Sequence, residues 1–272
     1  MRAVLVRTWN LFHGNARPPE RRAFLEEMVR LASADEPDVL CLQEVPVWAL
    51  GELESWSGMA AFGAVAARPA LGPFPSTAGV GRALTELDHG LLRSAFTGQA
   101  NAVLVSPLLR GAAEPALVLN SRSFRRVQAR WLELGLVARL AWARERRVCQ
   151  AVRVTDAEGR TTLVGNLHAT SYRPDERLAD AELLRAAAFA DGLAAPDEPI
   201  VLCGDFNVTA ERSRTLADLC SPEWGFAGPG PGIDHVLVRG ARASTAERWP
   251  DERRRVDGRL LADHTPVEVR VG

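Results

Sequence analysis

Short runs of apolar, mostly β-branched residues recur along this chain, and they constrain its fold more than any other feature. Runs of this length and composition are typical of strands buried in the core of a sheet. We expect five of them to form core strands, at residues 3–7, 39–42, 102–105, 162–165 and 200–203. Two later runs of the same character predict further strands at residues 236–238 and 267–271.

Amphipathic stretches separate these strands. Apolar side chains recur at helical spacing in residues 21–32 and again in residues 175–193. The apolar faces comprise Phe24, Leu25, Met28, Val29 and Ala32 in the first stretch, and Leu178, Ala181, Leu184 and Ala188 in the second. Residues 81–96 are a further candidate helix, whereas residues 58–77 are rich in Gly, Ala and Pro and predict an irregular excursion. Helices interleaved with strands favour an α/β fold whose helices cover the outer faces of the sheet.

Composition sets limits on the class of protein. No long polar linker or fixed-period repeat is present, so we expect a single domain over residues 1–272. The formal net charge of −1 excludes a protein that binds nucleic acid through a strong overall positive charge, although all 33 basic residues are arginine. The beginning of the chain is too short and strand-like for a signal peptide, and no apolar run of about 18 residues exists. We therefore expect a soluble, cytoplasmic protein.

The four cysteines, Cys41, Cys149, Cys203 and Cys220, are far apart and form no paired motif. Three of them lie inside apolar runs, which favours buried thiols over disulfides or metal ligands.

Polar residues gather where the predicted strands end. The first, second, fourth and fifth strands are followed by polar side chains, and the last two strands are preceded by them. These residues are Asn10, Gln43, Glu44, Asn166, His168, Asp205 and Asn207 after strands, and Asp234, Asp263 and His264 before strands. If the last two strands run antiparallel to the others, all of these ends meet at one edge of a mixed sheet or of two facing sheets. Ligands of open α/β sheets bind at that edge.

The side chains at this edge predict a particular chemistry. Carboxylates and amides supply oxygen ligands and no cysteine is near, which favours Mg²⁺ or Mn²⁺ over structural zinc. Histidines paired with carboxylates supply general acid and base groups, and they can donate to an anionic transition state. Together these groups suit metal-assisted hydrolysis at phosphorus.

Each motif also has an ordinary structural interpretation. Gln43 and Glu44 after a strand are common in a solvated loop, and a histidine such as His168 at a strand end is often only a hydrogen-bonded polar group. Asp205 and Asn207 are more specific, because they directly follow four core residues and a glycine. The complete set in this order is far more specific than any of its members.

With these motifs in place, the chain resembles the endonuclease/exonuclease/phosphatase family, which includes deoxyribonuclease I, AP endonucleases, bacterial sphingomyelinases and inositol polyphosphate 5-phosphatases. The resemblance covers nearly the whole chain, through "TWNLFHG", "LQEV", "GQANAVLVS", "GNLHAT", "GDFNV", "IDHVLV" and "ADHTPVEV". It implies a four-layer α/β/β/α sandwich with two mixed β-sheets and a divalent cation, Mg²⁺ or Mn²⁺, at the site.

The resemblance also implies roles for the residues that match these motifs. Glu44 would be the main metal ligand with Asn10 beside it, and Asp263 would be a ligand or lie just behind one. Asp205 would orient or deprotonate the attacking water, and Asn207 would help to place that water and the phosphate.

The remaining roles fall to the histidines and their neighbours. His264 would contact the phosphate, held in its tautomer by Asp234, and His168 would hydrogen-bond the scissile phosphate. Asn101 and Asn166 would contact the substrate phosphate, although a structural turn explains Asn101 equally well.

Two positions depart from the AP endonuclease pattern. AP endonucleases carry an aspartate two residues after the first asparagine, where this chain has Phe12, and a tyrosine where it has His168. Both differences favour the branch that contains deoxyribonuclease I, sphingomyelinases and 5-phosphatases.

Residues 121–147 bear on the substrate. They contain eight arginines, at positions 122, 125, 126, 130, 139, 144, 146 and 147, against Glu133 and Glu145. Such a segment could follow a phosphate backbone or form a solvated helix face. We expect Arg147 to contact phosphate, and Trp131 and Trp142 to pack in the core rather than stack on bases.

These features leave three classes of function open. We favour a metal-dependent DNA endonuclease. The alternative is a phospholipid (sphingomyelinase-like) or inositol polyphosphate hydrolase, which ranks lower because the sequence shows no clear exposed apolar hairpin; we therefore expect no stable membrane association. A scaffold with an inactive site is disfavoured by the intact set of motifs.

Overall fold

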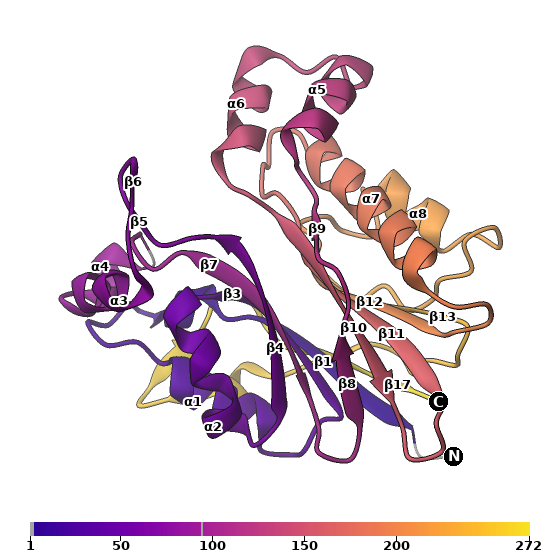
Figure 1. Cartoon of the computed structure of the whole chain (residues 1–272), viewed down its shortest axis with the longest axis horizontal. Helices are drawn as coiled ribbons and strands as arrows, with labels where there is room; N and C mark the ends of the chain where they lie inside the picture. Colours follow the sequence, from indigo (N-terminus) through magenta and orange to yellow (C-terminus); the bar gives the residue numbers. More distant parts are fainter. Residues whose placement is uncertain (1–2, 94) are drawn as a thin grey trace.

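The computed structural model describes residues 3–93 and 95–272, in which two large sheets stack face to face between outer helices (Figure 1). The first sheet has six strands in the order β14, β17, β1, β3, β7 and β4, with β1 and β3 parallel and all other neighbours antiparallel. Its strands are β1 (Val4–Asn10), β3 (Val39–Val45), β4 (Ala60–Ala67), β7 (Gln99–Val105), β14 (Glu247–Arg248) and β17 (Val267–Val271).

The second sheet repeats this arrangement. Its order is β13, β12, β11, β10 and β8, with β9 also paired to β10, and only β11 and β12 are parallel. Its strands are β8 (Arg110–Ala113), β9 (Leu117–Val118), β10 (Val148–Thr155), β11 (Thr161–His168), β12 (Ile200–Asp205) and β13 (Asp234–Arg239). β17 and β13 run antiparallel to β1 and β12, so the predicted orientation of the last two strands is confirmed.

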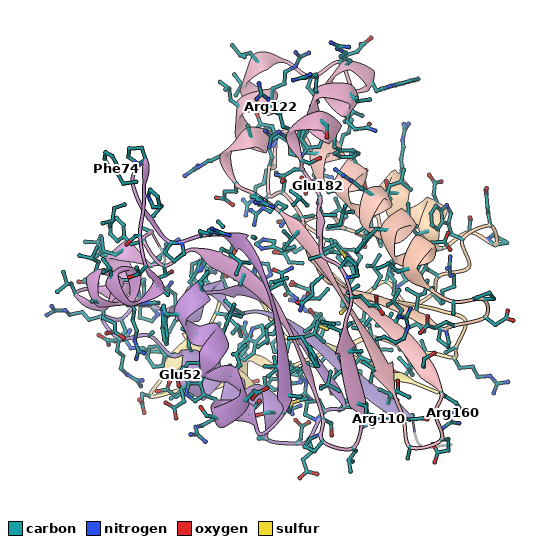
Figure 2. The ribbon with its side chains drawn as sticks, viewed as in Figure 1. Glu52, Phe74, Arg110, Arg122, Arg160 and Glu182 are labelled. Carbon is teal, nitrogen blue, oxygen red and sulfur yellow. The ribbon has the colours of Figure 1, made fainter. Side chains whose placement is uncertain are left out.

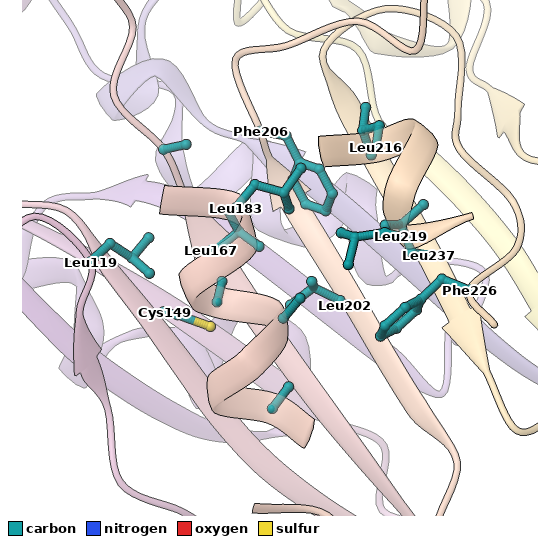
Figure 3. Close-up of a cluster of buried hydrophobic side chains, with 14 of the residues drawn as sticks. Leu119, Cys149, Leu167, Leu183, Leu202, Phe206, Leu216, Leu219, Phe226 and Leu237 are labelled. Carbon is teal, nitrogen blue, oxygen red and sulfur yellow. The ribbon is translucent and has the colours of Figure 1, made fainter. Parts of the chain in front are cut away.

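Successive side chains of each strand face opposite sides of its sheet, so each sheet contributes to an inner and an outer layer of the core. Val201 and Cys203 of β12 face the other sheet, where nearly all the apolar residues are valines, whereas Ile200 and Leu202 face outward. On that outer side, α7 (Arg177–Leu193) and α8 (Arg214–Leu219) pack against larger side chains (Figure 3). On the outer side of the first sheet, α1 (Leu25–Ser33) and α2 (Leu53–Ser57) do the same. The four-layer sandwich is therefore confirmed.

Helix α1 buries the face that its sequence predicts, but α7 does not. The predicted face of α7 included Leu184 and Ala188, yet both are exposed, Leu184 to 45%. The helix is rotated so that Glu182 lies on its buried side and accepts three hydrogen bonds there. The buried residues of α7 are Leu178, Ala179, Glu182, Leu183, Ala186, Ala187 and Ala190.

The segment at residues 58–77, expected to be irregular, contains β4, an edge strand of the first sheet, and a hairpin of β5 (Ala70–Leu71) and β6 (Phe74–Pro75). Alanine and glycine carry little strand preference, and pairing with β7 decides the structure there. The candidate helix at residues 81–96 is two helices, α3 (Ala78–Glu86) and α4 (His89–Leu92). Residue 94 of that prediction lies outside the described residues.

The remaining elements lie around the sandwich. They are β2 (Ala16–Arg17), β15 (Arg255–Val256) and β16 (Arg259–Leu261), which form a small sheet, and the 3₁₀ helices η1 (Phe12–Gly14), η2 (Val47–Gly51) and η3 (Asp251–Arg254). Helices α5 (Arg122–Trp131) and α6 (Leu136–Arg144) and the β5–β6 hairpin project from the same side of the molecule (Figure 1). Cys41, Cys149 and Cys203 are buried free thiols, as expected, and Cys220 is exposed. Across the described ranges, no helix is long and apolar enough to cross a membrane.

Candidate active site between the ends of the two sheets

The inward-facing positions of the central strands change from apolar to polar as each strand approaches one edge of the sandwich. In β12 the inward residues are Val201, Cys203 and then Asp205. The side chain of Asn10, at the end of β1, crosses from the first sheet and donates to Asp205 at 3.0 Å. Because every second side chain of a strand faces the other sheet, the polar side chains at these strand ends lie in the space between the sheets.

Asp205 is preceded by an unusual backbone conformation at the end of β12. Gly204 has φ of +135°, and a Cβ atom there would lie 1.9 Å from the carbonyl oxygen of Leu167, so only glycine fits. The following turn returns the backbone N–H of Asn207 to the Asp205 carboxylate at 3.0 Å, and the Asn207 amide donates to the carbonyl of Ala169 at 2.9 Å. Burial raises the pKa of Asp205 to about 7, although the nearby His264 opposes that rise.

Glu44 reaches the same space through a break in strand alternation. The pairing of β3 with β7 shifts register between Leu42 and Val45, and Glu44 has φ of +53°. Such a bulge turns one side chain away from the direction that strict alternation would give. The Glu44 carboxylate lies 3.1 Å from Nε2 of His13 and 3.7 Å from Nε2 of His168.

His264 and Asp234 form a close pair. Nδ1 of His264 lies 2.9 Å from both carboxylate oxygens of Asp234, and Nε2 lies 3.7 Å from Asp205. Burial alone would lower the pKa of His264, but the Asp234 hydrogen bond and the surrounding carboxylates raise it to about 10. The indole of Trp9 donates to the His264 carbonyl at 3.0 Å and so fixes the backbone. His264 is therefore held as an imidazolium with Nε2 facing the site.

His168 is held in the opposite charge state. Its ring is buried, and Nη1 of Arg147 lies 2.9 Å from Nε2 and 3.0 Å from Nδ1. The Gln99 amide also lies 2.9 Å from Nδ1. Burial, with the positive charges of Arg147 and His264, holds the pKa of His168 well below its usual range. The site thus pairs one neutral and one charged histidine around Asp205, whose carboxylate is 3.5 Å from His168.

Asn166 and Asn101 make hydrogen bonds between the two sheets. Asn166 is fully buried, and its amide donates to the carbonyls of Leu42 and Ala102 at 3.0 and 2.9 Å while accepting from Gln43 at 2.8 Å. Asn101 is also buried and donates weakly to carbonyls of the second sheet, at 3.3 Å. Both amides therefore join the two sheets. The three bonds of Asn166 use its whole amide, which suits that structural task better than a phosphate contact, whereas the phosphate contact expected of Asn101 stays a prediction.

Two site residues were missed by sequence reasoning, His13 and Gln99. His13 follows β1 in an unusual conformation with φ of +55°, and its carbonyl accepts from Nε2 of His89 at 2.9 Å. It lies three residues after Asn10, so its place in the same motif as that asparagine was the available signal. Gln99 lies within "GQANAVLVS", two residues before Asn101 and therefore on the same side of β7.

The donor atoms fit a hard divalent cation. Asp205, Asp234 and His264 present ligand atoms within 4.8 Å of one another, and Glu44 adds a partly exposed carboxylate. Asp263 is bound to Arg17 at 2.9 Å through Oδ2, and its buried Oδ1 has no hydrogen-bond partner among the described residues. Oxygen atoms left unsatisfied in this way suit a cation. Asn10 fits less well as a ligand, because its amide oxygen accepts from the backbone N–H of Phe12.

A family model described as the endonuclease/exonuclease/phosphatase family matches residues 8–264, which include every polar strand end described above. The chain belongs to this family. Its members are divalent-metal-dependent phosphoesterases, which agrees with the donor atoms gathered here. Among curated proteins, no sequence matches the chain.

Solved structures of the family share the fold over almost the whole chain. A Bacteroides vulgatus endonuclease/exonuclease/phosphatase has a TM-score of 0.68 at 14% identity, covering 100% of this chain and 99% of its own. A mannosyl-6-phosphatase from Bacteroides thetaiotaomicron has a TM-score of 0.63 at 14% identity and covers 99% of both chains. Truncated TDP2 from Caenorhabditis elegans has a TM-score of 0.59 at 15% identity, covering 99% of this chain and 97% of its own. At these identities the likeness concerns the fold, not the substrate.

Proposed function

We propose that this family member is a phosphodiester hydrolase whose reaction takes place between Asp205 and His264. The observation that carries the proposal is the contrast between these neighbours: a carboxylate with a pKa near 7 lies 3.7 Å from an imidazolium held by Asp234. A base that titrates near neutral pH suits proton abstraction from water. A fixed cation beside it suits an anionic transition state at phosphorus.

Asp205 accepts a proton from the attacking water, which Asn207 helps to place, as the water oxygen bonds to phosphorus. The bond from phosphorus to the leaving oxygen breaks in the same step, and the leaving oxygen takes a proton from solvent water. His264 stabilises the charge that develops on the phosphoryl oxygens, and the neutral His168 donates a hydrogen bond to them. Glu44 and Asp263 would hold Mg²⁺ or Mn²⁺, which when bound acts as a Lewis acid on the phosphate. Asn10 positions Asp205 through the hydrogen bond that joins the sheets.

DNA is the first substrate that we propose. The arginines of residues 122–146 form no ion pair within the described part of the chain, so their charge is available to a polyanion. Arg147 is different, because it is buried and pairs with Glu145 at 2.5 Å. We propose that Arg147 acts mainly on His168 and only secondarily on phosphate.

A phospholipid substrate is the second candidate, and a specific observation favours it. The β5–β6 hairpin, which the sequence did not reveal, presents Phe74 at its tip with 70% of the residue exposed (Figure 2). Trp131, expected in the core, is also exposed, whereas Trp142 is buried as expected. Exposed apolar side chains on the site's side of the molecule suit a lipid surface better than a nucleic acid.

Parallel assays on plasmid DNA and on sphingomyelin vesicles, each with Mn²⁺, with Mg²⁺ and with EDTA, test the proposal. We expect Asp205→Asn and His264→Gln to lose at least about 10²-fold in rate. Asp218→Asn, an exposed carboxylate on α8, is the matched control and should keep wild-type activity. Plasmid nicking that weakens steeply with salt would identify DNA as the substrate. Metal-dependent activity that survives Asp205→Asn would refute the proposed mechanism.

A further inference from the structure

Helices α5 and α6 expose a group of large apolar side chains that the fold leaves uncovered. We call this group the α5–α6 surface, and it consists of Val127, Trp131, Leu136, Val137 and Leu140. Trp131 is 81% exposed, Leu136 and Val137 are each 71% exposed, and Leu140 is 62% exposed. Soluble proteins seldom gather so many exposed apolar side chains without a partner for them.

The exposure is built into the fold, because the opposite sides of both helices are already packed. Ala129 of α5 and Trp142 of α6 are buried in a small cluster with Leu134 and Leu178. The Trp142 indole donates to Glu182 of α7 at 2.5 Å, which ties α6 to the body of the protein. Helix α6 cannot turn its outer side inward without breaking this buried hydrogen bond, and α5 cannot do so without exposing Ala129.

The same helices carry a strong and unbalanced positive charge. Six arginines lie between residues 122 and 144 against one carboxylate, Glu133. Arg125 and Arg139 donate to backbone carbonyls of Asn120 and Leu134, and none of the six pairs with a carboxylate within residues 3–93 and 95–272. A partner of the α5–α6 surface must therefore offer both apolar volume and negative charge.

We propose that the α5–α6 surface docks reversibly onto an anionic phospholipid bilayer. Aliphatic residues such as Leu136 and Leu140 gain nothing from a phosphate backbone, whereas they can enter the acyl region while arginines contact lipid phosphates. Trp131 suits the boundary between the two regions. The proposal replaces the expectation of no stable membrane association with a peripheral contact.

Docking would place the membrane beside the active site. Helix α6 ends at Arg144, and three residues later Arg147 contacts His168. Helices α5 and α6 and the β5–β6 hairpin also project from the same side of the molecule (Figure 1). The contact does not depend on the proposed phosphodiesterase activity, because it requires no residue of the site.

Co-sedimentation of the full chain with vesicles, in EDTA so that no turnover occurs, tests the proposal. We expect binding to phosphatidylcholine vesicles that contain phosphatidylglycerol, and at least about tenfold weaker binding to pure phosphatidylcholine. The double variant Trp131→Ser and Leu140→Ser should lose at least about tenfold in affinity for the anionic vesicles. Leu184→Ser, an exposed leucine on α7, is the matched control and should bind as wild type does.

A second pair of measurements separates the other partners. The double variant should keep wild-type circular dichroism and urea unfolding, because both side chains are exposed, and it should bind a double-stranded oligonucleotide no more weakly than wild type. Wild-type protein that fails to bind anionic vesicles would overturn the proposal. So would a double variant that still binds them fully, or one that loses oligonucleotide binding instead, which would identify a nucleic-acid surface.

Discussion

Asp234→Asn removes one carboxylate charge from His264 while leaving the shape of the pair almost unchanged. The structure predicts a large effect, because Nδ1 of His264 lies 2.9 Å from both oxygens of that carboxylate. The pKa of His264 rises from 6.5 to about 10 in the folded protein. At about 1.36 kcal/mol for each pKa unit, the rise is a net effect of about 5 kcal/mol, in which the attraction of Asp234, Asp205 and Asp263 exceeds the opposing effect of burial.

We expect the variant to lower the pKa of His264 by about two units, since a close opposite charge contributes roughly one to three. Nuclear magnetic resonance of the ring carbons, recorded in EDTA across pH 5–11, measures it directly. The chain has only five histidines, and the pKa values of the other four, His13, His89, His168 and His235, are all lowered. His264 should therefore be the single ring that titrates above pH 8. A wild-type His264 that titrates near 6.5 would refute the reasoning.

The same pair makes stability depend on pH. The folded pKa of His264 is higher than its unfolded value, so its contribution to stability is complete below about pH 6.5 and is lost as pH rises toward 10. Urea unfolding in EDTA should show wild type losing stability over that window. Asp234→Asn should flatten the dependence, and a wild-type curve that is already flat there would contradict the assignment.

Three further outcomes follow from other contacts. Glu182→Ala should reduce the free energy of unfolding by about 3 kcal/mol in urea titrations, because the Trp142 indole and the Thr170 backbone N–H lose a buried acceptor; a loss below about 1 kcal/mol would show that water replaces it. His13→Ala should weaken Mn²⁺ binding to the metal-free protein by about tenfold in calorimetry, since His13 lies 3.1 Å from Glu44, and unchanged affinity would place the cation elsewhere. Gly204→Ala should yield little folded protein, because its Cβ would overlap the Leu167 carbonyl; a well-folded variant would show that the end of β12 can relax.

Sequence reasoning succeeded where one strong pattern decided the structure. β-branched runs predicted the central strands, and polar residues at their ends predicted the edge at which Glu44, Asp205 and His264 meet. It failed where weak local preferences were overruled by pairing. β4 is largely alanine and glycine and becomes a strand only because β7 pairs with it. The alanine-rich α7 offered several nearly equivalent faces, and the hydrogen bonds of Glu182 selected one of them.

Site residues were hardest to judge where burial decided their role. From the motif "GNLHAT", Asn166 was expected to contact phosphate. Only the packing of the two sheets shows that its amide is fully used in hydrogen bonds. The only signal for His13 was its place three residues after Asn10, and an ordinary surface histidine could have the same place. Trp131 was expected in the core because it lies among leucines, yet α5 turns it outward.

The buried amides that join the two sheets make the geometry of the active site depend on how the sheets are aligned. Valine contacts between the layers are non-directional, so they would tolerate a small slide of one layer over the other. The bonds of Asn166 to Gln43, Leu42 and Ala102 would not, because hydrogen bonds require direction. Glu44 belongs to the first sheet and Asp205 to the second. We therefore expect the catalytic rate to fall as soon as the two sheets shift relative to each other, before circular dichroism detects any loss of helix or strand.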